Sequence, residues 1–238
     1  MGRTLVIARR ELRAYFDSPI AYIFSIVFLV LACLRFFHDF FFFQQASLRG
    51  LFEVLPYLFL LIVPALTMRL WAEERRSGTE ELLLTFPVRP FEVVAAKFLA
   101  AFALVVGTLL LSTPLAVTAA LLGPLDRGPV LGGFVGAAFL GAAYLAFGMF
   151  VSSLTRNQIV AFILTLVGLL AFVLVGSRIV LMTAPAGIAT LLESLDLESH
   201  FQSIARGVFD LRDLLYYLVF IGFFLYLNAA TLTWRRWR

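Results

Sequence analysis

Long runs of apolar residues alternate with short polar segments along most of the chain. A helix needs about 20 mainly apolar residues to cross a bilayer, with a range of about 17–25. Stretches of this kind lie at residues 20–37, 51–70, 93–122, 130–154, 159–175 and 214–233. Pro56, Pro64 and Pro114 lie inside them, where kinks are tolerated because neighbouring helices can bind the freed carbonyls. The pattern predicts an all-α membrane protein, with six transmembrane helices in a single domain over residues 1–238.

The first 17 residues form a separate amphipathic segment. Apolar positions recur at helical spacing and arginines cover the other sides: Leu5, Ala8, Leu12, Tyr15 and Phe16 against Arg9, Arg10 and Arg13. This pattern is typical of a helix that lies in the membrane interface. Ser18 and Pro19 should separate it from the first span, because the residue before a proline is steered away from helix and serine is a good N-cap. A plain positively charged leader is the alternative.

The segment between the second and third runs is far more charged than a simple connector needs. It reads MRLWAEERRSGTEELLLTFPVRPFEVVAAKF from Met68. Residues 69–76 hold two glutamates and three arginines within helical reach of one another, which favours a solvated extension of the second helix. Gly78 should end that extension, because glycine readily takes the left-handed conformation.

A short, separate helix is expected directly after Gly78. Thr79 is a good N-cap, and the two glutamates that follow it lie in the first turn, where the helix dipole favours anions. Leu82 and Leu83 come next, and a Phe-Pro pair ends the helix. Either lipid headgroups or a groove on another protein would bury these leucines.

Two other connections are polar. Residues 152–158 read SSLTRNQ and form either a simple turn or a second small contact on the same side of the membrane. Residues 177–213, on the opposite side, are amphipathic and fit one or two short interfacial or re-entrant helices. They contain several carboxylates and one histidine, but no pair of histidines at ligand spacing, so no metal site is predicted.

The composition agrees with a membrane protein. The 238 residues are 62% hydrophobic and 14% charged, whereas soluble domains are about 45–50% apolar and about 25% charged. A soluble fold of this length could not bury so much apolar surface, which excludes a soluble enzyme and a nucleic-acid-binding module. The single cysteine, Cys33, excludes an intrachain disulfide.

The distribution of positive charge predicts the orientation. Six spans put both termini on one side, and placing that side in the cytoplasm makes 13 of the 19 basic residues cytoplasmic. These are Arg3, Arg9, Arg10, Arg13, Arg69, Arg75, Arg76, Arg89, Lys97, Arg156, Arg235, Arg236 and Arg238. The positive-inside rule therefore favours cytoplasmic termini.

The chain lacks the usual signs of an energy source. It has no GxxxxGK[ST] phosphate-binding loop, and its spans have no charge near their centres of the kind that ion-coupled carriers use. It also lacks the residues of an intramembrane protease. A membrane subunit driven by a separate ATPase is the simplest interpretation.

Four stretches resemble the permease subunits of type 2 ABC transporters, in particular the gliding-motility-type branch. They are RRELRAYFDSPIAYI, MRLWAEERRSGTEELLLTFPV, SSLTRNQIVAF and HFQSIARGVFDLRDLLYYLVF, and they occur in the order found in that family. The resemblance implies an interfacial elbow helix at 1–17, a coupling helix at 78–85, a smaller contact at 153–158 and an extracytoplasmic re-entrant region at 184–213. It also implies the bacterial cytoplasmic (inner) membrane.

The resemblance further implies which residues act and which partners are present. ATPase docking would use Glu73, Arg76, Gly78, Thr79, Glu80, Glu81, Leu82, Leu83 and Arg156. The membrane anchor would be Arg9, Arg10 and Arg13, and the outer gate would include His200, Gly207, Asp210 and Asp213. Two permease copies would work with two ATPase subunits that bind ATP and Mg, within a lipid membrane and with room for an extracytoplasmic accessory protein. This chain itself would hold no cofactor and bind no nucleic acid.

Three functions stay open from the sequence. The first is an ATP-driven exporter that works by alternating access. The second is a complex of the same type that transmits force or a signal across the membrane without moving a solute. The third is a membrane enzyme, and the transported substrate cannot be read from the residues.

Overall fold

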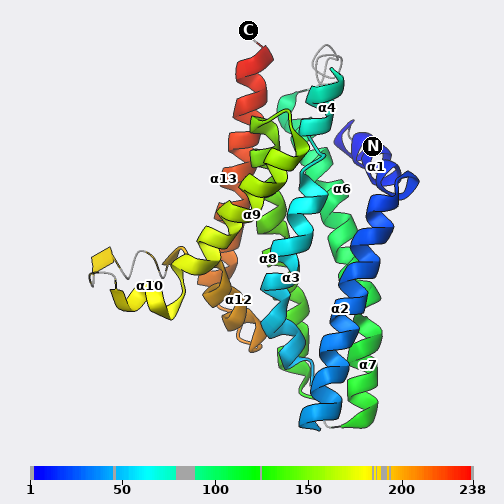
Figure 1. The fold of residues 1–238 in the computed structure, drawn as a ribbon, viewed down its shortest axis with the longest axis vertical. Coiled ribbons are helices and arrows are strands. Elements are labelled where there is room, and N and C mark those ends of the chain that lie inside the picture. The colour runs from blue at the N-terminus through cyan, green and yellow to red at the C-terminus, as the bar shows by residue number, and fades with distance from the viewer. Residues whose placement is uncertain are drawn as a thin grey trace.

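The computed structural model describes residues 3–44, 47–78, 89–123, 125–183, 185, 187–188, 192 and 194–236. No described residue lies in a strand. The helices are α1 (Arg3–Asp17), α2 (Pro19–Phe43), α3 (Arg49–Thr67), α4 (Ala72–Ser77), α6 (Pro90–Leu111), α7 (Thr113–Leu122), α8 (Arg127–Leu154), α9 (Gln158–Val175), α10 (Arg178–Thr183), α12 (Leu197–Ala205) and α13 (Leu211–Arg236). The long helices run side by side, and both chain ends lie at the same end of the bundle, at the top of Figure 1. That end is called the termini end below, and the opposite end is called the far end.

Six helical segments among the described residues are long and apolar enough to cross a membrane, which confirms the predicted number. They are Pro19–Phe43, Arg49–Ser77, Pro90–Leu122, Arg127–Leu154, Gln158–Val175 and Leu211–Trp234. The first continues six residues beyond the predicted end at residue 37, so that the phenylalanines at 40–43 belong to the same helix.

Two of the long segments are interrupted. The second was expected to continue as one helix through residue 76, but α3 ends at Thr67 and α4 begins only at Ala72. The third is interrupted at Ser112, two residues before Pro114 in the first turn of α7, because proline has no N–H to continue the hydrogen-bond ladder. Pro56 and Pro64 stay inside α3.

The predicted break between the first two helices is present. α1 ends at Asp17, and Ser18 has an extended backbone with φ −106° and ψ 152°. Its hydroxyl accepts a hydrogen bond from the Ile20 N–H at 3.3 Å, which caps α2. The cap turns the chain, so that α1 packs across α6 instead of continuing α2.

Helix α8 is the centre of the bundle and packs against α3, α6, α9, α12 and α13. Its glycines let these neighbours approach closely. A Cβ atom on Gly133 would lie 2.2 Å from the Phe52 ring of α3, and one on Gly148 would lie 2.3 Å from the Thr67 hydroxyl. The two glycines therefore fix how closely α3 lies against α8.

Candidate functional site

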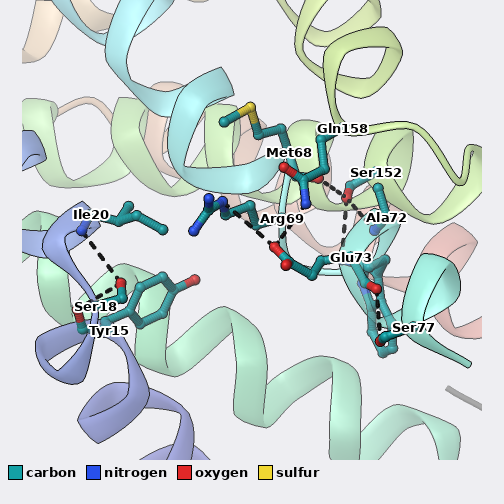
Figure 2. A network of polar contacts seen from close by, with 11 residues as sticks. Tyr15, Ser18, Ile20, Met68, Arg69, Ala72, Glu73, Ser77, Ser152 and Gln158 are labelled. Carbon is teal, nitrogen blue, oxygen red and sulfur yellow. Dashed lines mark hydrogen bonds and ion pairs between the residues drawn. The ribbon is translucent and has the colours of Figure 1, made fainter. Parts of the chain in front are cut away.

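The turn between α3 and α4 is held by one buried serine on α8. The Ser152 hydroxyl accepts hydrogen bonds from the Trp71 N–H at 3.2 Å and the Ala72 N–H at 3.3 Å, and it donates to the Met68 carbonyl at 3.2 Å (Figure 2). The end of one helix and the start of the next leave backbone N–H and C=O groups without hydrogen-bond partners, and this hydroxyl acts as the partner for three of them. The break after Thr67 is stable for that reason, although sequence periodicity favoured a continuous helix.

Helix α4 also contacts the turn between α8 and α9. The Gln158 side-chain amide donates to Glu73 Oε2 at 2.7 Å, and Arg69 Nε lies 3.6 Å from the same oxygen (Figure 2). Arg75 donates to the Ser153 carbonyl at 3.1 Å. Two polar stretches about 80 residues apart, both predicted as contact points, therefore lie side by side at the termini end.

A buried lysine joins α4 to two further helices. Lys97 of α6 has 2% of its side chain exposed, and its Nζ donates to Glu74 Oε1 at 2.6 Å and to Glu11 Oε2 at 3.1 Å. The ammonium also lies 5.2 Å from the centre of the Trp71 ring, within range of a cation–π interaction. Sequence patterns alone did not predict this cluster. The one available signal was that the only lysine of the chain stands at the start of an apolar run.

The inner face of α1 is buried beside this cluster. Burial raises the pKa of the Tyr15 hydroxyl far above its ordinary range, and the nearby charges of Glu11 and Glu74 raise it further. Tyr15 is therefore a neutral phenol at any physiological pH. The outer face of α1 carries Leu5, Val6, Arg9, Arg10 and Arg13 around an open cavity of about 410 Å³.

The structure describes part of the predicted docking set. Glu73, Arg76 and Arg156 lie at the termini end, and the last two are exposed. Gly78 ends α4 with a φ of +75°, the left-handed conformation expected of it. Thr79, Glu80, Glu81, Leu82 and Leu83 lie outside the described residues.

The predicted outer residues lie at the start of α13 and around α12. His200 Nδ1 lies 2.7 Å from Asp213 Oδ1, and the His200 ring stacks on Tyr216 with ring centres 4.1 Å apart. Asp196 caps α12 by accepting hydrogen bonds from the N–H groups of Glu198 and Ser199, at 3.0 Å each.

The other two outer residues have backbone roles. Gly207 has a φ of +86° and lies so close to Gly128 that a Cβ atom there would be 2.8 Å from the Gly128 carbonyl carbon. Asp210 accepts a hydrogen bond from the Arg212 N–H at 2.9 Å, which caps the start of α13. His200 and Asp213 are therefore paired, whereas Gly207 and Asp210 shape the turns around them.

A cavity of about 470 Å³ opens at the far end between the start of α3, the start of α8 and α12. Its lining combines apolar side chains such as Phe52 and Phe201 with the charged side chains of Arg49, Glu53 and Arg206. Within the described part of the chain, no group of three or more His, Cys, Asp or Glu residues could hold a metal ion.

A family model described as "ABC-2 family transporter protein" matches residues 43–196. The chain belongs to this family. It is thus a multi-pass membrane permease component of an ABC transporter, a component that is generally non-catalytic and works with an ABC ATPase. A comparison with curated proteins found no match to this chain. The matched region includes α4, the α8–α9 turn and the glycine-rich α8, and leaves α1 and α13 outside.

Proposed function

We propose that this permease is the membrane-spanning subunit of an ATP-driven type 2 exporter of the gliding-motility-type branch. Two copies would form the transport path between them, and two ATPase subunits that bind ATP and Mg would drive alternating access. The termini would face the cytoplasm of a bacterium, across its inner membrane, in line with the excess of positive charge on that side.

The observation that carries this proposal is the joining of α4 to the α8–α9 turn. Glu73 and Gln158 are 85 residues apart in the chain, and their side chains form a 2.7 Å hydrogen bond. The two stretches that resemble the family's contact points thus form one polar surface at the termini end. A partner that pushes on this surface would act on three spans together: the second through α4, and the fourth and fifth through the turn.

The remaining parts follow from this orientation. Helix α1 would be the elbow helix, with Arg9, Arg10 and Arg13 on anionic headgroups. Residues 78–85 would form the coupling helix that enters a groove of the ATPase. The region 184–213 would be the re-entrant closure of the outer end, where an extracytoplasmic accessory protein would bind.

The test is reconstitution with the cognate ATPase subunit. We expect the chain, purified in mild detergent, to be a dimer without ATP hydrolysis, and activity to appear when the ATPase is added. Robust hydrolysis by the purified chain alone would contradict the proposal. Movement of a solute into or out of sealed vesicles separates an exporter from a complex that transmits only force or a signal.

A further inference from the structure

Lys97 has an unusual position for a charged side chain. Removing an ammonium group from water is costly unless the charge is paired and hydrogen-bonded, and an apolar side chain of similar length would carry no such cost. Here the side chain is 2% exposed, and its carboxylate partners come from two different helices. The pairing of Lys97 with Glu11 spans 86 residues of sequence, so the cluster is a tertiary link and not a local helix contact.

The cluster joins three helices around one nitrogen atom and reaches a fourth helix through Trp71. Lys97 belongs to α6, Glu11 to α1 and Glu74 to α4. Trp71 places its ring near the ammonium, and its backbone N–H donates a hydrogen bond to Ser152 of α8. Separating α4 from α6 would break the Lys97–Glu74 pair, and separating α1 from α6 would break the Lys97–Glu11 pair. Breaking a pair that holds a buried ammonium costs far more than separating an exposed pair.

The contacts that Glu73 makes on α4 are weaker links. The Arg69–Glu73 pair is about half exposed, with 44% and 53% of the side chains accessible, and Gln158 binds the same exposed carboxylate. Water can replace those partners when α4 moves. The Lys97 cluster is therefore the contact most able to keep α4 and α1 in a fixed relation.

We propose that Lys97 is a positioning residue that makes α1, α4 and the start of α6 move as one body. This inference rests on the proposed function for the source of the movement, an ATPase that acts at the termini end. A push on α4 would then shift the third span and the interfacial helix together, and α1 would carry the movement along the membrane surface.

The test measures the distance between α1 and the α3–α4 turn with spin labels. The only cysteine is replaced by Cys33→Ala, and labels are placed through Ala14→Cys and Arg69→Cys, both at exposed positions. Distances are recorded for the free permease and for its complex with the ATPase trapped by ATP and vanadate. Co-purification of the ATPase checks that the labelled protein still docks.

With Lys97, and with the charge-retaining Lys97→Arg, we expect one narrow distance population that trapping leaves unchanged. With Lys97→Met we expect a broader population that shifts on trapping, while the ATPase still co-purifies. If Lys97→Met fails to fold, the triple variant Lys97→Met, Glu11→Gln and Glu74→Gln removes the buried charges together and should show the same broadening.

A distance population in the folded methionine variants as narrow as that of the parent, and unmoved by trapping, would overturn the proposal. The free permease reports on the link without any partner. Failure of the ATPase to bind would therefore contradict the proposed function, and not this inference.

Discussion

At the termini end, α4 is held by charged and polar side chains, whereas at the far end α12 packs closely on the glycines of α8. The Lys97 cluster and the Glu73–Gln158 bond join helices whose residues lie far apart in the sequence. At the other end, a Cβ atom on Gly132 of α8 would lie only 2.1 Å from the Ile204 carbonyl oxygen of α12. A Cβ atom on Gly136 would lie 3.1 Å from the Phe201 ring of α12.

The difference indicates which substitutions should destabilise each end. A polar network is sensitive to loss of charge, because each buried charge depends on its partner. A glycine contact is sensitive to added volume, because backbone atoms cannot move aside cheaply. Both ends leave arginines and glutamates at the surface, but only the termini end has a lysine buried between two carboxylates among the described residues.

The largest effect is expected from removing the buried charge at the termini end. Lys97→Met removes the buried ammonium that Glu11 and Glu74 share and should lower the free energy of unfolding by about 3–5 kcal/mol. The matched control is Arg49→Met at the far end, where the Arg49–Glu53 pair is 82% and 57% exposed. Such exposed pairs contribute under about 1 kcal/mol. Denaturant titration of the two variants in detergent measures these losses. Equal losses of unfolding free energy would show that the buried charge at the termini end is no more important for stability than the exposed pair at the far end.

The outer face of α1 should bind anionic lipid through its three arginines. Each basic residue near an anionic surface contributes about 1 kcal/mol, so replacing Arg9, Arg10 and Arg13 with glutamate should cost about 3 kcal/mol of membrane binding at this helix. The amount of assembled complex recovered from membranes measures the loss. Unchanged yield and unchanged ATPase activity in the triple variant would refute the anchoring role.

Added volume should matter at the far end. Gly132→Ala forces a methyl group against the Ile204 carbonyl and should destabilise the protein by about 1–3 kcal/mol. Gly107→Ala is the control, because a Cβ atom there meets nothing within 4 Å and alanine favours helix over glycine by about 0.5–1 kcal/mol. We expect Gly132→Ala to lower the midpoint temperature of thermal unfolding in detergent, and Gly107→Ala to leave it unchanged or raise it. The opposite order would show that α12 is not held by this contact.

A smaller, pH-dependent effect is expected at Glu198 of α12. Burial raises the pKa of its carboxyl group, and the charge of Asp196 adds to this, although hydrogen bonds from Tyr57 and Gln202 act in the other direction. Because the folded state then binds the proton more tightly than the unfolded state, stability should fall as the pH rises from the ordinary value of about 4.3 through the raised pKa. Glu198→Gln should remove this slope from the unfolding midpoint measured between pH 4 and 7, and a slope that persists would rule out this carboxyl group as its source.

Sequence patterns predicted local features well. The apolar runs indicated six spans, Ser18 and Pro19 marked the break after α1, and Gly78 marked the end of α4. Each of these depends on neighbouring residues alone.

Contacts between distant residues were not predictable in this way. The partners of Lys97 lie 23 and 86 positions away, and the bond that lets the chain turn after Thr67 comes from Ser152. His200 and Asp213 were both selected from the sequence, but their pairing depends on how α12 packs beside α13. Helical periodicity carries no information about such partners, because they are set by the packing of whole helices.

If the termini end docks an ATPase, as we propose, two double variants should differ in how much of that ATPase co-purifies with them. Leu82→Asp with Leu83→Asp should abolish binding, because two leucine contacts contribute about 3–6 kcal/mol and burying the new carboxylates adds a further cost. Leu195→Asp with Val208→Asp, at exposed apolar positions of the far end, should leave binding at wild-type stoichiometry. If the first variant remains a folded dimer and still retains the ATPase at wild-type stoichiometry, the docking site assigned to the termini end is wrong.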